Sequence, residues 1–254
     1  MSPFNEPLAV LTGFSLLLLL LAWASQEIGQ RIQGIVSLLT GSQDLAMVVL
    51  FLVFLPGILL HEGAHWAMAR LLGLRTGKFR VWPRRMGRHI GMGSVSVARG
   101  GPVRDSLVGL APLLVGSLVV GWIGGRLDQA GGVTAQWQQG SGPLQGIVAL
   151  FRGLGTASDG LLWGYLLFAV ANAMMPSASD REPLGTLGLY LAGFGLLYLL
   201  LGRPGHLLAQ AGTWLVGPLR GLLGAFLLAA LLDLLVLAGL YLAEAGLGHL
   251  FRSR

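Results

Sequence analysis

Long apolar runs constrain this chain more than any other feature of its sequence. Several of them approach or exceed the roughly 20 residues that a helix needs to cross the hydrocarbon core of a bilayer. The runs are continuous, unlike the alternating pattern of a membrane β-barrel, so helices are the expected spanning elements. A mean hydropathy of +0.72 and only 11% charged residues agree with this interpretation. We therefore predict an all-α polytopic membrane protein that contacts the lipid bilayer.

About six transmembrane helices can be placed along the chain. The expected spans are residues 8–25, 44–72, 105–127, 160–175, 184–202 and 220–247. The first is expected to be a retained anchor, because it lacks the basic start of a signal peptide. All 254 residues would then form a single integral-membrane domain with its core at about 44–202.

Three segments between these spans are more polar. Residues 26–40 are expected to form a short interfacial helix or an ordered loop. Residues 128–159 are expected to be a polar Gly/Gln-rich connection, and residues 203–217 an interfacial connection broken at Gly217-Pro218.

Basic residues are unevenly distributed. Nine of the 17 lie between Arg70 and Arg104, and the chain ends with Arg252 and Arg254. Such blocks beside spanning helices are typical of cytoplasmic loops near anionic lipid. We therefore expect a multi-pass protein of a prokaryotic cell membrane with both termini in the cytoplasm. No nucleic-acid partner is expected, although the net charge is +6.

Residues 74–104 differ from the spans around them. Phe79 and Val81, and later Val95 and Val97, alternate with polar neighbours across a Gly- and Arg-rich turn. This period is typical of strands, so we expect a small membrane-associated β-hairpin between the second and third spans. Such a hairpin could hold an unwound substrate by strand addition.

The second span ends with His61-Glu62-Gly63-Ala64-His65. Histidines four residues apart on a helix share one face, so both imidazoles can reach one metal ion. Glu62 lies on the same turn and can act as a general base toward water. Because the chain has no cysteine, a zinc site would need His and carboxylate ligands. The alternative is two buried histidines whose hydrogen bonds are satisfied by their neighbours.

A catalytic zinc site usually has a third protein ligand. The candidates left open by the residues alone are Asp180, Asn172, Asp233 and Glu244. Asp180 is favoured because it follows the fourth span on the side where His65 is expected, and Asp233 is second. The remaining histidines, His89, His206 and His249, are expected to be surface groups.

The segment Asn172-Ala-Met-Met-Pro176-Ser-Ala-Ser-Asp180, taken with the histidine motif, resembles the site-2 protease family of intramembrane zinc metalloproteases. The resemblance covers the second to fourth spans and the β-rich loop. It implies one Zn²⁺ held by His61, His65 and Asp180, with Glu62 as the general base and Asn172 near the substrate carbonyl. The implied substrate is a single-pass transmembrane protein or peptide.

Three departures mark the chain as a divergent member of that family. Pro176 stands one position later than in the family pattern, and Arg181 replaces the usual glycine after the aspartate. The third span contains Gly109-Leu-Ala-Pro112 without the asparagine often found nearby. Two other functions stay open: a prenyl-type protease with Glu244 or Asp233 as third ligand, and a catalytically inactive zinc-binding membrane scaffold. A transporter is less favoured, because the charges cluster at one edge.

Overall fold

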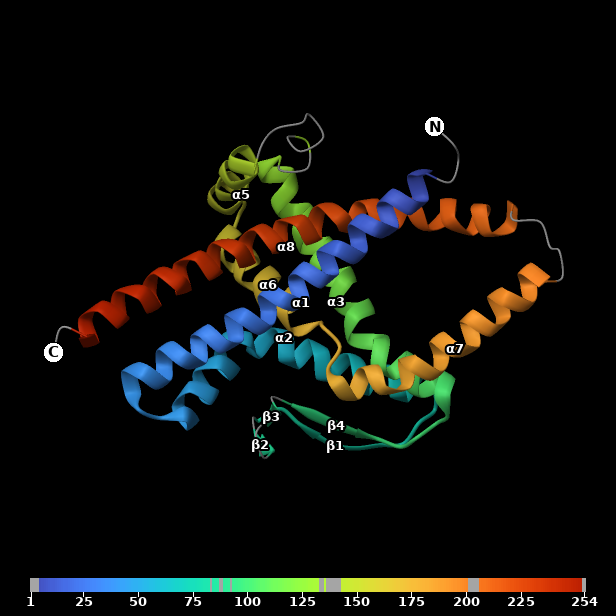
Figure 1. The fold of residues 1–254 in the computed structure, drawn as a ribbon, viewed down its shortest axis with the longest axis horizontal. Helices are drawn as coiled ribbons and strands as arrows, with labels where there is room; N and C mark the ends of the chain where they lie inside the picture. The colour runs from blue at the N-terminus through green and yellow to red at the C-terminus, as the bar shows by residue number, and fades with distance from the viewer. Residues whose placement is uncertain are drawn as a thin grey trace.

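The computed structural model describes residues 5–82, 84–86, 89–91, 93–132, 135, 143–200 and 206–252. Most of them are helical: α1 Asn5–Thr40, α2 Gln43–Leu71, α3 Pro102–Gly131, α5 Pro143–Thr156, α6 Gly160–Ala173, α7 Ala178–Leu200 and α8 His206–Arg252. Four short strands lie between α2 and α3: β1 Thr76–Arg80, β2 Arg84–Met86, β3 His89–Gly91 and β4 Ser94–Val97. The mainly helical fold and the β element after the second apolar helix confirm the prediction (Figure 1).

Within the described part of the chain, four helical segments are long and apolar enough to cross a membrane: Ala9–Thr40, Gln43–Leu71, Pro102–Gly131 and Val216–Gly248. They support a membrane protein, but six full spans are not reproduced. The predicted fourth span corresponds to α6, whose 14 residues rise only about 21 Å, against a hydrocarbon core of about 30 Å. The apolar part of α7, Gly188–Tyr198, is similarly short.

Two of the segments expected between spans are parts of long helices instead. Residues 26–40 continue α1 without a break. Arg31 in this segment donates to Glu244 on α8 and also to Glu27 in its own helix. Residues 206–217 belong to α8, which runs through Pro218. A proline deletes one backbone hydrogen bond, and a membrane helix tolerates this when its surroundings satisfy the freed carbonyl.

The expected polar connection at 128–159 also contains a helix. There α3 ends at Gly131, and Gly132 adopts a left-handed φ of 74° that stops it. Helix α5 then packs on α3 at close range, since a Cβ on Gly131 would lie 2.3 Å from the Ala149 carbonyl oxygen. The glycine-rich composition of this segment led to the prediction of a connection, but the segment has an apolar face that includes the buried Ala149 and Leu150. Residues 133–134 and 136–142 lie outside the described part of the chain.

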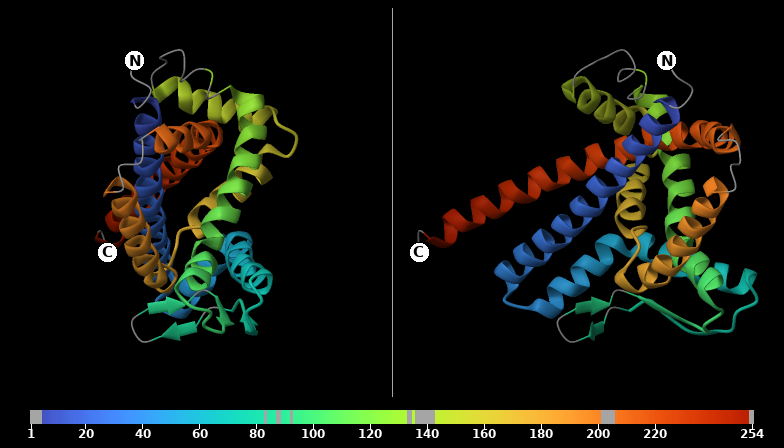
Figure 2. Two further views of the ribbon diagram at one scale, coloured as in Figure 1. Left: turned by 90° about the vertical axis from the view of Figure 1, so that its right-hand side faces the viewer. Right: turned by 45° about the vertical axis from the view of Figure 1, so that its right-hand side comes forward.

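The largest core joins α1, α3, α6 and α8 around Phe226, Leu21, Ile123 and Leu167. Figure 2 shows α1 and α8 side by side along one flank and α2 beneath them, close to α6 and the start of α3. The far half of α7 extends away from this bundle (Figure 1). The near end of α7 therefore meets α2 and α3 at one end of the molecule.

The β element lies at that end (Figure 1). Strands β1 and β4 pair antiparallel with Phe79 opposite Val95, and β2 pairs with β3 beyond them. The prediction of a hairpin is confirmed, although it consists of two successive two-stranded sheets separated by an irregular stretch. Strand β4 passes the C-terminal half of α2, which brings the hairpin beside the histidine motif.

Candidate metal centre

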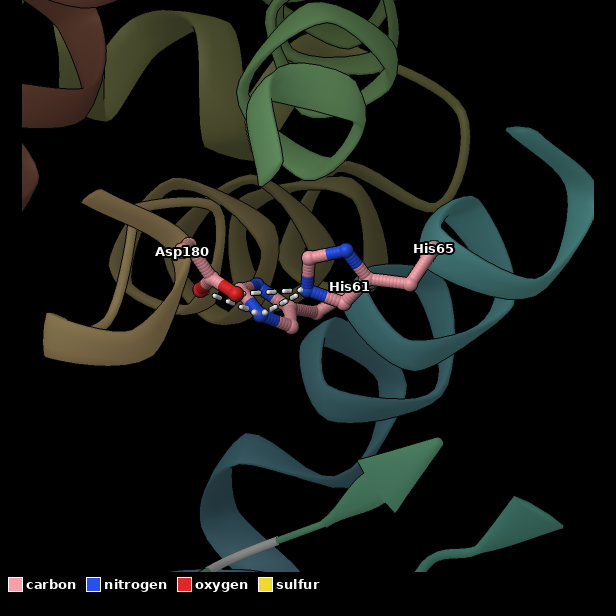
Figure 3. A group of neighbouring side chains, drawn as sticks. All are labelled: His61, His65 and Asp180. Carbon is pink, nitrogen blue, oxygen red and sulfur yellow. Dashed lines mark hydrogen bonds and ion pairs between the residues drawn. The ribbon is translucent and has the colours of Figure 1, made fainter. Parts of the chain in front are cut away.

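His61 and His65 project from one face of α2, as their spacing predicts (Figure 3). Their Nε2 atoms are 3.1 Å apart. Each Nδ1 is bonded to a backbone carbonyl oxygen, His61 to Ala173 at 2.7 Å and His65 to Val108 at 2.8 Å. Because a carbonyl can only accept, each Nδ1 carries a proton, and the two Nε2 atoms are left to face each other. Such carbonyl contacts typically fix the tautomer and orientation of metal-binding histidines.

Neither of these two carbonyl oxygens is used by a hydrogen bond within its own helix, and the sequence explains why. The Val108 carbonyl would normally accept from the N–H of residue 112, but Pro112 has none. Ala173 is the last residue of α6, where carbonyls have no partner within the helix. Pro112 is a residue whose contribution to the site the sequence analysis missed, although a proline four positions after a carbonyl is a readable signal.

Asp180 lies in the first turn of α7 and points at the two histidines (Figure 3). Its Oδ2 is 3.5 Å from Nε2 of His61, and its Oδ1 is 3.2 Å from Nε2 of His65. The backbone N–H of Ser177 donates to Oδ2 at 2.8 Å, which fixes the carboxylate. Gly109 admits this turn, because a Cβ there would lie 2.4 Å from the Asp180 carbonyl oxygen.

The ionisation of Asp180 follows from these contacts. Burial by itself raises the pKa of this carboxyl group, but hydrogen bonds from His61, His65 and Ser177 outweigh burial. The net effect holds the pKa of Asp180 well below its usual range. The carboxylate is therefore charged and ready to act as a ligand.

One ligand atom from each of His61, His65 and Asp180 can be chosen so that all lie within 4.8 Å of one another. With Nδ1 of both rings bonded to carbonyl oxygens, Nε2 of each ring and the Asp180 oxygens are the atoms that converge, and a bound metal ion would replace the protons shared between them. Such a cluster is stabilised by a cation placed between its members, and two imidazoles with one carboxylate match a known catalytic zinc set. The three residues can therefore hold a metal ion.

Glu62 lies on the same helix and is only 8% exposed. The backbone amide of Val95 on β4 is a hydrogen-bonding partner of its carboxylate. Gly93 passes so close that a Cβ there would lie 2.7 Å from Oε1 of Glu62. The hairpin thus fixes the carboxyl group that the sequence assigns as a general base.

Asn172 lies on α6 and is 7% exposed. Its Nδ2 donates to the Phe168 carbonyl oxygen at 2.9 Å and to Oδ1 of Asp233 at 2.8 Å. Both amide hydrogens are therefore used within the protein, and neither is free for a substrate carbonyl in this conformation. Contact between Asn172 and substrate stays a prediction.

The other candidate ligands lie elsewhere. Asp233 is paired with Asn172, and Glu244 binds Arg31 across the α1–α8 interface. His89 lies in β3, whereas His206 and His249 lie near the two ends of α8 rather than in loops. Among the described residues, no second group of His and carboxylate ligands assembles.

A cavity of about 1090 Å³ connects these groups. His61, Glu62, His65 and Asp180 line it, and it continues past Val95 toward Gly29 on α1. Its volume is slightly larger than the roughly 300–1,000 Å³ of ordinary ligand sites. Comparisons with models of known protein families, with curated proteins and with solved structures found no match.

Proposed function

We propose that this protein is an intramembrane zinc metalloprotease that hydrolyses peptide bonds of transmembrane substrates. The observation that carries the proposal is the convergence of His61, His65 and Asp180 beside Glu62 in one cavity. Position 61 begins the last third of a helix apolar enough to cross a bilayer. Ionisable groups in such segments are functional far more often than not.

A zinc ion bound by the three ligands would supply Lewis acidity and lower the pKa of a bound water toward about 7. The residues of the chain account for the remaining steps. Glu62 accepts the proton of the attacking water and returns it to the leaving amine as the peptide C–N bond breaks. Val95 and Gly93 hold its carboxylate in place during both transfers. Ala173 and Val108 keep the histidines in the tautomer that binds metal.

The proposed substrate is a single-pass transmembrane protein or peptide in the surrounding bilayer. Its helix must unwind before its carbonyls become accessible, and its freed backbone groups then need partners that lipid does not supply. Strand β4 suits this need, because β1 is its one neighbour in the described sheet and Ser94, Val95 and Val97 line the cavity. Addition of the unwound segment along β4 would bring it to Glu62.

The test compares zinc content and cleavage of synthetic transmembrane peptides by purified protein in lipid nanodiscs. Glu62→Gln should retain zinc and lose cleavage by about 10² or more, as expected for removal of a general base. Asp180→Ala should lose both zinc and cleavage. Asp44→Asn, an exposed acid-to-amide change in the same helix, is the control and should alter neither.

Full cleavage by Glu62→Gln would refute the proposed mechanism. Full retention of zinc by Asp180→Ala would move the third-ligand role to another residue. If Glu62→Gln keeps a biological activity that requires zinc, the protein acts instead as a zinc-binding membrane scaffold.

A further inference from the structure

The pair formed by Asp233 and Asn172 lies outside the proposed metal ligands. Asp233 is completely buried on α8, and Asn172 faces it from α6. One hydrogen bond joins them, from Nδ2 of Asn172 to Oδ1 of Asp233 at 2.8 Å. The other atom of each group, Oδ1 of Asn172 and Oδ2 of Asp233, has no partner.

A charged Asp233 would be poorly placed. It lies close to the middle of the candidate span Val216–Gly248. Its neighbours along α8 include the buried apolar residues Ala230, Leu231 and Leu237. Within the described residues, no cationic side chain pairs with it. An uncompensated carboxylate at such a depth is costly by several kcal/mol.

Counting donors and acceptors leads to the same result. A carboxylate is only an acceptor, so ionised Asp233 would leave Oδ1 of Asn172 and its own Oδ2 as two buried acceptors without a hydrogen. A protonated carboxyl group adds one O–H donor. That single proton supplies the one hydrogen that both unpartnered atoms lack.

We propose that Asp233 is held as the neutral acid and forms a two-bond acid–amide pair with Asn172. Oδ2–H of Asp233 donates to Oδ1 of Asn172, while Nδ2 of Asn172 donates to Oδ1 of Asp233. The pair satisfies all four polar atoms, so it explains how a carboxyl group can be buried here without a cation.

The pair also supports the metal centre. The backbone carbonyl oxygen of Asn172 accepts from Ser25 Oγ of α1 at 2.9 Å. The next backbone carbonyl oxygen, that of Ala173, accepts from Nδ1 of His61. The end of α6 thus joins α1, α2 and α8, and Asp233 fixes it from the α8 side. Asp233 is a positioning residue for His61, a role that rests on the metal binding of the proposed function but not on hydrolysis.

The experiment uses full-length protein in lipid nanodiscs at neutral pH, with infrared spectroscopy of ¹³C-labelled aspartate. Wild-type protein should show the carbonyl stretch of a protonated carboxylic acid, and both Asp233→Asn and Asp233→Leu should lack it. Asn172→Ala should shift or remove the same band, because it removes the partner. A wild-type spectrum containing only carboxylate bands would overturn the proposal.

The second readout is zinc affinity, measured by competition with a chromogenic chelator. Asp233→Asn replaces the acid by an amide that can form the same two hydrogen bonds, so its zinc affinity should stay within about twofold of wild type. Asp233→Leu removes both bonds and should weaken zinc binding about 10- to 100-fold, as for loss of a supporting partner. Equal weakening by both variants would refute the neutral pair. A protein that binds zinc and shows the acid band but cleaves nothing would keep this proposal and refute only the protease.

Discussion

Gly109 offers the most direct test of how the third ligand is positioned. It lies on α3 where this helix meets the first turn of α7, and a Cβ at this position would be 2.4 Å from the carbonyl oxygen of Asp180. Ordinary contacts of this kind begin at 3.4 Å. Gly109→Ala therefore requires the backbone of Asp180 to move by about 1 Å, since the added carbon cannot be accommodated otherwise.

A shift of this size is large for a metal ligand. Zinc–oxygen bonds are about 2.0–2.2 Å long, so 1 Å is nearly half a bond. Disturbing the support of a ligand typically lowers metal affinity about 10- to 100-fold, or about 1.4–2.8 kcal/mol. We expect Gly109→Ala to weaken zinc binding by this factor, although alanine favours the helix by roughly 1 kcal/mol over glycine.

The assay is competition for zinc with a chromogenic chelator, using purified protein in nanodiscs. Gly125→Ala is the matched control, because Gly125 lies on the same helix and a Cβ there meets nothing within 4 Å. It should gain the same helix propensity and bind zinc as tightly as wild type. Equal affinities of Gly109→Ala and Gly125→Ala would refute the positioning of Asp180 by this close approach.

Two further predictions concern the histidines. Pro112→Ala restores an N–H that competes for the Val108 carbonyl, so α3 should become more stable while zinc affinity falls about 10-fold. Pro56→Ala is the control, because the carbonyl that Pro56 leaves free, on Leu52, accepts from the Tyr165 hydroxyl at 3.5 Å. An unchanged zinc affinity of Pro112→Ala would contradict the role of Pro112. The zinc affinity should also fall as the pH is lowered, because metal ligands must be deprotonated and protons therefore compete with the ion. The pKa of Asp180 is held well below its usual range, so Asp180 stays ionised over this range. A chelator titration at several pH values measures this slope, and a pH-independent affinity would exclude histidine ligands.

The sequence predicted the parts of the site that depend on local geometry. Helical spacing was enough to place His61 and His65 on one face, and alternation was enough to predict the strands that contain Phe79 and Val95. Asp180 was chosen from several acidic residues by topology and resemblance, and the structure brings it to both imidazoles. The identity of a bound metal and the hydrolytic activity stay predictions.

The sequence did not predict features that depend on contacts between distant helices. Arg31 resembles the end of a span when only local hydropathy is considered, but Glu244, far along the chain, lets α1 continue. Helix α5 was missed because glycines reduce its apparent helix propensity, whereas packing against Gly131 of α3 decides its structure. Asn172 was expected to face substrate, and its partner Asp233 lies on a helix that no local pattern connects to it.

The two histidines show how far a sequence can be interpreted once such contacts are known. Each imidazole needs a carbonyl oxygen that no helix hydrogen bond uses, because only such an oxygen can fix Nδ1 as the protonated atom. Within α3 that condition is met four residues before a proline, at Val108, and at the end of α6 it is met by Ala173. The proline of Gly109-Leu-Ala-Pro112 and the early end of α6 are therefore not imperfections in two membrane helices. They create the two free carbonyls that turn both Nε2 atoms toward Asp180.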